Sequence, residues 1–219
     1  MRVAIIGTGR MGKALQEVLR AKGHSVVAAV GRPEPSFWES PSVEGVIDFS
    51  HASQTETVVK ACISRGLPLV TGTTGWQSQE ESLRTWATSQ SQARWIWGSN
   101  FSRGILLLKM ALKAIAAQWP SFSDWEAILV DIHHRHKKDA PSGTARELQS
   151  LFPFIQAIHS LRVGEVIGEH LLLLSGPSEE IELRHRAHSR VIFAEGAVWA
   201  LEWLVTQKHF VGRFDEIHL

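Results

Sequence analysis

Residues 133–145, HHRHKKDAPSGTA, crowd protonatable and cationic side chains beside a turn that can begin a helix. Histidine can donate a proton near neutral pH, and the free N–H groups of a helix N-terminus attract carboxylates. Thr144 and Glu147 have the spacing of a capping box, with Ser142 as an alternative N-cap. The stretch therefore predicts a carboxylate-binding pocket that contains a proton donor.

Other interpretations of this stretch explain less of it. His133 and His134 are adjacent at a predicted strand end, so their side chains diverge, and the single cysteine, Cys62, is far away in sequence; no metal site is expected. The chain has 23 Lys+Arg against 22 Asp+Glu and a net charge of +1, so no basic field indicates nucleic acid. A solvated basic loop would leave the adjoining Gly-Thr turn unexplained.

The first half of the chain alternates short apolar segments with helical ones. This pattern is typical of a parallel sheet covered on both faces by helices. The expected strands are 2–7, 25–30, 45–50, 68–73 and 93–100, and the expected helices are 11–23, 52–66 and 78–90.

The pattern changes near residue 102, where clustered strands replace the alternation. We expect helices over 105–119, 144–151 and 196–207, the last of which ends the chain, and strands over 124–134, 156–164, 168–176 and 179–187. The Gly-Pro pair at 176–177 predicts a turn between two antiparallel strands. The predicted fold is therefore α/β, with a Rossmann-type parallel-sheet domain plus a smaller α+β substrate-binding domain whose sheet is mostly antiparallel.

A glycine-rich segment, GTGRMG, lies between the first expected strand and the first expected helix. Its G-x-G-x-x-G spacing allows a tight turn and a close approach of the backbone to a pyrophosphate on the helix N-terminus. The second strand is followed by Gly31 and Arg32 rather than by a carboxylate, which favours a 2′-phosphate and hence NADPH. The dinucleotide contacts expected from the segment are Gly7, Thr8, Gly9, Arg10, Met11 and Gly12.

Two further loops follow strands of the same half, and loops at the carboxyl ends of parallel strands line the ligand crevice. Their small hydroxyl and amide side chains can contact a ribose, a phosphate or a nicotinamide. The candidates are Gly72, Thr73 and Thr74, and Gly98, Ser99, Asn100 and Phe101.

The composition indicates a cytoplasmic protein that acts on a small molecule. The N-terminal apolar run is too short for a signal peptide or a membrane span, and the segment 105–119 is interrupted by Lys109 and Lys113 at helical spacing. A single cysteine excludes a disulfide framework. We expect no membrane and no nucleic-acid partner.

Several motifs together resemble the 4-hydroxy-tetrahydrodipicolinate reductase family of bacterial lysine biosynthesis. The resemblance spans nearly the whole chain, in the family's order, and HHRHK…DAPSGTA is its most specific part. The motifs that carry it are GTGRMG, VIDFSH, VTGTTGW, GSNFSRGI, HHRHKKDAPSGTA, RVGEVIGEH and HRAHSRVIFAEGAVWALEWL.

The resemblance implies a role for each residue of the opening stretch. His133 becomes the general acid, His134 a substrate contact and Lys137 a second catalytic cation. The backbone of Gly143 and the hydroxyl of Thr144 bind a carboxylate of a cyclic dicarboxylate substrate. The glycine loop, Arg32 and the two later loops become contacts of the cofactor, with NADPH preferred and NADH possible.

The resemblance also implies the domain organisation. Residues 1–101 with 192–219 would form the dinucleotide-binding domain, and 102–191 the substrate-binding and catalytic domain. A homo-oligomer is expected, a tetramer in the family. The chain is shorter than typical members around 33–43 and 151–160, and the second region corresponds to a long loop tied to closure and subunit packing.

Two alternative functions remain open from the sequence. Another Rossmann reductase, such as an aspartate dehydrogenase, would explain GTGRMG but not HHRHKKDAPSGTA. A dinucleotide sensor without catalysis would not need both His133 and Lys137. Oxidation of NADPH with and without the cyclic substrate distinguishes these alternatives.

Overall fold

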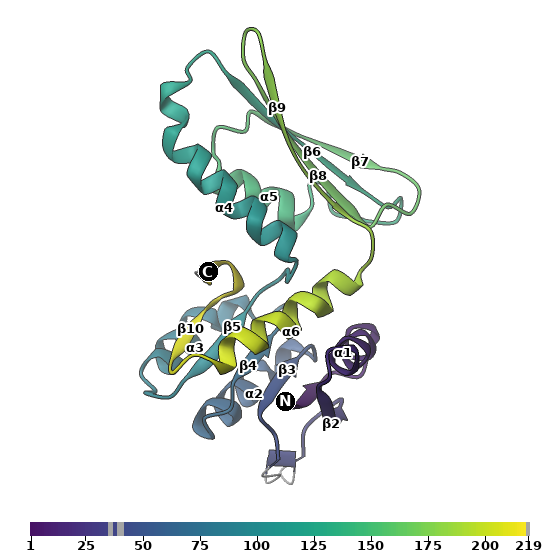
Figure 1. Cartoon of the computed structure of the whole chain (residues 1–219), viewed down its shortest axis with the longest axis vertical. Coiled ribbons are helices and arrows are strands. Elements are labelled where there is room, and N and C mark those ends of the chain that lie inside the picture. The colour runs from purple at the N-terminus through teal and green to yellow at the C-terminus, as the bar shows by residue number, and fades with distance from the viewer. Residues whose placement is uncertain (35–36, 39–41, 218–219) are drawn as a thin grey trace. The chain divides into compact units, whose positions relative to one another are not determined.

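The computed structural model describes residues 1–34, 37–38 and 42–217. Residues 35–36 and 39–41, which belong to the expected shortened region 33–43, lie outside the described residues. The chain divides into two compact units (Figure 1). One comprises Met1–Ser102 with Val191–Leu219, and the other comprises Arg103–Arg190.

The first unit is built on a parallel sheet of six strands with the order β10-β5-β4-β3-β1-β2. Its central strands are buried on both faces, which explains their continuous apolar sequence. The strands are β1 (Arg2–Ile6), β2 (Ser25–Val30), β3 (Gly45–Asp48), β4 (Leu69–Thr71), β5 (Arg94–Trp97) and β10 (Phe210–Arg213).

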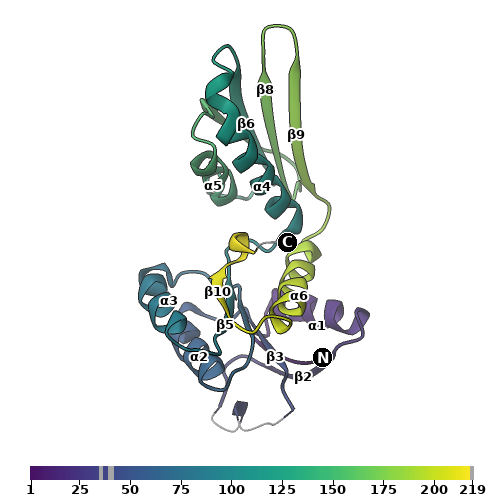
Figure 2. The same ribbon diagram turned by 60° about the vertical axis from the view of Figure 1, so that its left-hand side comes forward.

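Helices cover both faces of this sheet, α1 and α6 on one and α2 and α3 on the other (Figure 2). A cluster of tryptophans, Trp76, Trp95 and Trp97, packs into the core, with the Trp95 and Trp97 rings 4.3 Å apart. The helices are α1 (Arg10–Ala21), α2 (Ala52–Ser64), α3 (Glu80–Thr88) and α6 (Val191–Val205), with short 3-10 turns η2 (Gln77–Gln79) and η4 (Phe214–Glu216).

The strand order reverses between β1 and β3, which are neighbours in the sheet although β2 lies between them in sequence. In open parallel sheets, ligands bind in the crevice outside the carboxyl ends of the strands at such a reversal. The loops after Ile6 and Asp48 meet at this point. The fold therefore places GTGRMG at the strand-order reversal, where ligands of open parallel sheets bind.

The second unit has a four-stranded sheet with the order β7-β6-β8-β9. Strand β7 runs parallel to β6, and the other two pairings are antiparallel, which confirms a mostly antiparallel sheet. Both helices pack on one face of the sheet (Figure 2). The elements are α4 (Arg103–Gln118), η3 (Trp119–Ser121), β6 (Glu126–His133), α5 (Gly143–Leu151), β7 (Ala157–Arg162), β8 (Gly168–Ser175) and β9 (Glu180–Ala187).

The structure corrects one expectation about the elements and decides between two N-caps that the sequence left open. The last helix does not end the chain, because β10 follows it and pairs with β5 as a sixth parallel strand. The N-cap of α5 is Ser142 rather than Thr144, since Ser142 Oγ accepts from the backbone N–H of Ala145 at 3.1 Å. Glu147 instead forms an ion pair with the buried Lys109 of α4 at 2.8 Å. No helix among the described residues is long and apolar enough to cross a membrane.

Candidate active site

The core-facing side of β6 changes from apolar to ionisable along its length. Ala127 and Leu129 belong to the hydrophobic core beneath α4 and α5, and Asp131 and His133 continue the same side. These four residues share one face because every second side chain of a strand points to the same side. The exposed fractions of Asp131 and His133 are 0% and 8%. A buried carboxylate and a buried imidazole thus replace core residues at the end of β6.

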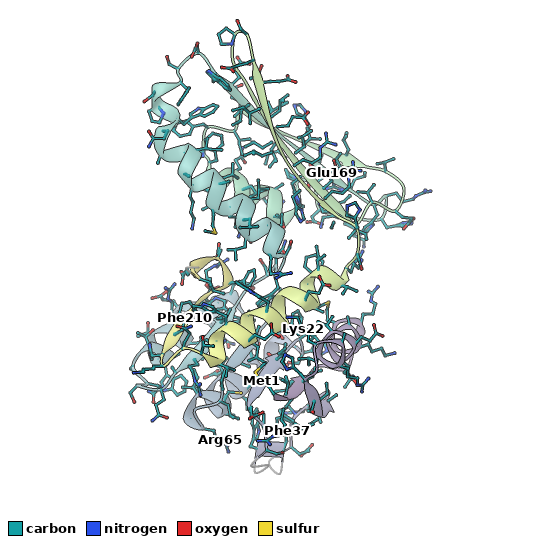
Figure 3. The ribbon with its side chains drawn as sticks, viewed as in Figure 1. Met1, Lys22, Phe37, Arg65, Glu169 and Phe210 are labelled. Atoms are coloured by element: carbon teal, nitrogen blue, oxygen red, sulfur yellow. The ribbon has the colours of Figure 1, made fainter. Side chains whose placement is uncertain are left out.

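The strand register lines up four polar residues in one row across the whole sheet. Asp131 on β6 lies directly opposite Ser160 on β7 and His170 on β8, and His170 lies opposite His185 on β9. Glu169, the neighbouring residue on β8, is labelled in Figure 3. Because side chains alternate along a strand, Glu169 lies on the other face of the sheet, where it pairs with Arg186 of β9 at 2.8 Å. The pairing of strands therefore assembles the polar cluster.

The two oxygens of Asp131 have different partners. Oδ1 lies 2.8 Å from His133 Nε2 and 3.5 Å from His170 Nε2. Oδ2 accepts hydrogen bonds from the Ser142 backbone N–H at 2.9 Å, from the Ser160 hydroxyl at 3.2 Å and from Arg162 Nη2 at 3.1 Å. One carboxylate thus connects β6, β7, β8 and the start of α5.

These contacts keep Asp131 ionised although it is buried. Burial alone would raise the pKa of its carboxyl group. The contacts with His133, Ser142 and Arg162 outweigh burial and hold the pKa well below its ordinary value. Asp131 is therefore a fixed negative charge inside the unit.

Protein acceptors face both ring nitrogens of His133. Besides the Asp131 contact at Nε2, Nδ1 donates to the Ile167 carbonyl oxygen at 3.2 Å. Gly168 packs against the ring edge, because a Cβ at this position would lie 3.1 Å from Cε1 of His133. Nε2 is buried and lies close to Asp131 Oδ1, but it forms no hydrogen bond with any residue that the structure describes.

His170 completes the cluster as a neutral group. Its ring is 4% exposed, and its centroid lies 5.4 Å from that of His133 in an edge-to-face arrangement. Burial lowers the pKa of His170 to about 4 despite the neighbouring Asp131. Nε2 of His170 also lies 3.4 Å from Ser142 Oγ, which links the row to the helix cap.

The N-terminus of α5 projects from this cluster. Ser142 is fixed at its backbone N–H by Asp131, and Gly143 and Thr144 follow as the first helical residues. Gly143 is exposed and Thr144 is half-buried. A helix N-terminus with accessible N–H groups suits a carboxylate ligand.

The remaining cations of the stretch lie at the surface of the cluster. Lys137 is paired with Asp139 at 2.8 Å, and this contact lowers the pKa of Asp139. His134 is half-buried, and its pKa lies below the ordinary value because of desolvation first and the neighbouring Arg190 second. His133 and His134 thus point to different sides, and only His133 enters the core.

The structure does bring together three groups of the kind that ligate metals. The ligand atoms of Asp131, His133 and His170 lie within 4.8 Å of one another. The same carboxylate is already bound by the Arg162 guanidinium, and Lys137 adds positive charge nearby. These cations disfavour a divalent ion, so we interpret the group as an internal network rather than a metal centre.

In the first unit, a cavity of about 480 Å³ lies at the strand-order reversal. It is lined by residues of three loops that the sequence identifies as cofactor contacts or their neighbours. Those residues are Gly9, Arg10, Met11, Phe49, Ser50, His51, Ala52, Gly72, Thr73 and Thr74.

The backbone around this cavity fits the pyrophosphate of a dinucleotide. A Cβ on Gly7 would lie 2.3 Å from the Phe49 carbonyl oxygen, and a Cβ on Gly12 would lie 1.9 Å from the Gly7 carbonyl oxygen. Glycine at both positions therefore lets β1, the turn and α1 approach one another closely, as the fingerprint requires. The N-terminus of α1 begins at Arg10, with Gly9 as its N-cap.

A buried carboxylate, Asp48, joins two loops of the cavity. It accepts from the Ser50 backbone N–H at 3.0 Å and from the Thr73 hydroxyl at 3.2 Å. Burial raises the pKa of Asp48 above its ordinary value. These bonds hold the ends of β3 and β4 together where the cavity opens.

The other predicted cofactor residues lie around the same unit. A Cβ on Gly31 would be 3.8 Å from Thr8 Oγ1, so the exposed Arg32 follows β2 beside the glycine loop. The loop with Gly98, Ser99 and Asn100 follows β5. Phe101 is buried, and its ring packs 4.8 Å from that of Phe214, so its side chain belongs to the core.

Sequence reasoning missed several residues in and around the polar cluster. Asp131, Arg162, Gly168 and His170 were not identified as site residues. Asp131 and His133 are two residues apart in a strand, which is a signal that both face one side. The involvement of His170 depends on the β6–β8 register, which sequence does not specify.

A doubly wound parallel sheet with a glycine-rich turn, joined to a second unit with a buried histidine–carboxylate cluster, defines an oxidoreductase that uses a nicotinamide dinucleotide. The N-terminal model of dihydrodipicolinate reductase matches residues 1–101, and the C-terminal model matches residues 104–217. The chain belongs to the dihydrodipicolinate reductase family.

Individual proteins are similar to the chain in sequence or in fold. The 4-hydroxy-tetrahydrodipicolinate reductase of Xanthomonas euvesicatoria pv. vesicatoria is 38% identical over 226 residues, which cover 94% of this chain and 92% of the relative. The dipicolinate-bound dihydrodipicolinate reductase from Paenisporosarcina sp. TG-14 has a similar fold, with a TM-score of 0.86, 20% identity and coverage of 100% and 99% of the two chains. The aspartate dehydrogenase from Thermotoga maritima has a TM-score of 0.54 at 16% identity, with coverage of 96% and 99%.

Proposed function

We propose that the chain is a 4-hydroxy-tetrahydrodipicolinate reductase, which forms tetrahydrodipicolinate on the route to diaminopimelate and lysine. The observation that carries this proposal is the match of both halves of one enzyme family to nearly the whole chain. The buried histidine–carboxylate cluster beside a helix N-terminus supports it, because the substrate is a dicarboxylate that must accept a proton.

The second unit would bind and protonate the substrate. The 4-hydroxyl group must leave as water, which gives a conjugated cyclic imine, and a bound reduced nicotinamide would supply the hydride to a ring carbon of this imine. His133 would donate the proton that the resulting enamine requires, with Lys137 as a second catalytic cation. The backbone N–H of Gly143 and the hydroxyl of Thr144 would hold one carboxylate at the start of α5, and His134 would contact the substrate.

The first unit would hold the cofactor. The glycine loop from Gly7 to Gly12 would receive the pyrophosphate, and Gly72 to Thr74 and Gly98 to Phe101 would contact the rest of the molecule. We infer that NADPH is preferred over NADH, since Arg32 can pair with a 2′-phosphate where an acidic residue would repel it.

The domain assignment and assembly belong to the same proposal. Residues 1–101 with 192–219 would bind the cofactor, and 102–191 the substrate. We expect a homo-oligomer, although residues 152–156 connect α5 directly to β7 and bury Phe152 and Ile155. A chain with Cys62 as its single, buried cysteine suits the cytoplasm.

The test is oxidation of NADPH by the purified protein, coupled to the aldolase-type synthase that forms the substrate from pyruvate and aspartate semialdehyde. NADH is measured in parallel. The proposal predicts turnover only when the synthase and both of its substrates are present. NADPH binding without turnover would instead support a sensor.

A further inference from the structure

The carboxylate of Asp131 has no assigned part in the reaction, although it touches the proton donor and the start of the carboxylate-binding helix. We propose that Asp131 is a positioning residue that orients the ring of His133 and fixes α5 relative to it. This inference rests on the proposed function, because it assigns a task to Asp131 through the roles of His133 and α5.

The position of the His133 ring is set from three directions. Asp131 Oδ1 lies 2.8 Å from Nε2, and the Ile167 carbonyl oxygen accepts from Nδ1 at 3.2 Å. On the ring edge, the backbone of Gly168 packs close to the ring, since a Cβ at this position would lie 3.1 Å from Cε1. Asp131 is the only one of these three neighbours that carries a charge, and it is the one that matches the charge of a protonated ring.

The second oxygen of the Asp131 carboxylate, Oδ2, holds the N-terminus of α5, where we propose that the substrate binds. Oδ2 accepts from the Ser142 backbone N–H, and Ser142 Oγ then caps α5 through Ala145. Arg162 binds both Oδ2 and the Asp139 carbonyl oxygen, at 3.1 and 2.6 Å, so it also holds the loop before Ser142. Because Asp131 contacts both His133 and Ser142, its carboxylate sets the distance between the proposed proton donor and the N-terminus of α5, where we propose that the substrate carboxylate binds.

The substitution Asp131→Asn distinguishes the effect of Asp131 on the His133 ring from its effect on the folding of the unit. The amide of Asp131→Asn keeps one oxygen, which can still accept from Ser142 and Arg162, and places an NH₂ group toward Nε2 of His133. That group donates, so it replaces the negative charge beside Nε2 with a hydrogen-bond donor, which favours an unprotonated Nε2. A displaced or wrongly protonated general acid lowers kcat, whereas the binding of substrate at α5 persists.

The experiment measures kcat, KM for the cyclic substrate and NADPH affinity in the synthase-coupled assay. We expect Asp131→Asn to lower kcat about 100-fold, with KM and NADPH affinity within about threefold of wild type. In a His133→Gln background, the same exchange should change kcat less than about twofold, because its effect passes through His133. The matched control Ser150→Ala removes a side-chain hydrogen bond from the C-terminal part of α5, away from Asp131, and should leave kcat within about twofold.

A second variant covers the case in which Asp131→Asn does not fold because Arg162 is left unpaired. Asp131→Asn with Arg162→Gln removes both charges of the buried pair, which is tolerated better than removing one. Nitrogen-15 spectra of the histidine rings add a readout without turnover: in the asparagine variants, Nε2 of His133 should show the shift of an unprotonated nitrogen.

The outcomes separate the two proposals. Wild-type kcat in folded Asp131→Asn, or an equal loss of kcat in the His133→Gln background, would overturn the positioning role and leave the proposed function intact. A wild-type chain that never turns over would overturn both.

Discussion

His170 has a pKa of about 4, chiefly because burial disfavours its charged form, whereas the ordinary value is 6.5. The unfolded chain therefore binds a proton at His170 more readily than the folded chain between these two pH values. Stability from this residue is fully present above about pH 6.5 and is lost as the pH falls toward 4. The expected loss is at most about 3 kcal/mol.

Urea unfolding of wild type and His170→Gln at several pH values measures this contribution. The variant should show a flatter fall in the free energy of unfolding between pH 6.5 and 4. His188→Gln, at an exposed position after β9, serves as the control and should keep the wild-type slope. Equal slopes for wild type and His170→Gln would contradict the buried, neutral state of His170.

Arg32 carries the prediction about cofactor preference. It is exposed and follows Gly31, which lies next to Thr8 of the glycine loop, and a charge-assisted hydrogen bond to a 2′-phosphate would contribute about 1.5–3 kcal/mol. Arg32→Ala should therefore raise KM for NADPH roughly 10- to 100-fold and leave KM for NADH nearly unchanged. The control is Arg20→Ala, which removes an exposed arginine of α1. A parallel loss with both cofactors would show that Arg32 does not distinguish them.

At the scale of residues, sequence predicted the chemistry of His133 and Lys137 but not its electrostatic setting. HHRHK identified a basic cluster because its members are adjacent. The acidic centre of the cluster, Asp131, was counted as part of a strand, since alternation alone does not distinguish a buried carboxylate from a solvated one. His170 lies 39 residues along the chain from Asp131, and only strand pairing brings them together.

Among the elements, α5 depends most on a single cap. Ser142→Ala removes the bond to the Ala145 N–H and should lower the free energy of unfolding by about 1 kcal/mol. It should also raise KM for the substrate, because the N-terminal turn of α5 loses its support. Ser150→Ala at the other end of α5 is the control. Unchanged KM in Ser142→Ala would argue against a substrate site at this N-terminus.

Most elements could be predicted, and the exceptions have physical causes. Most strands of the first unit are continuously apolar and alternate with amphipathic helices, so the sequence pattern identified both kinds of element. The short edge strand β10 was missed because four residues, FVGR, have no clear alternation and gain their place only by pairing with β5. The sequence left the cap of α5 open between Ser142 and Thr144, because both are good N-caps and the choice depends on the Asp131 contact.

For the whole molecule, the sequence indicated two units of different sheet type, and the structure has two. The cavity at the strand-order reversal lies in one unit, and the histidine–carboxylate cluster lies in the other. This separation predicts that chemistry and cofactor binding respond independently to substitution. Changes in the second unit should affect turnover without affecting the binding of NADPH.

The most direct test of the proposed catalytic roles compares His133→Gln and Lys137→Ala with wild type. The synthase-coupled assay gives kcat, and fluorescence titration gives NADPH affinity. We expect each variant to lower kcat about 100-fold or more, because a general acid or a catalytic cation is lost, and to keep NADPH affinity within about twofold of wild type. Wild-type turnover in both variants, or a loss of NADPH binding equal to the loss of turnover, would contradict these roles.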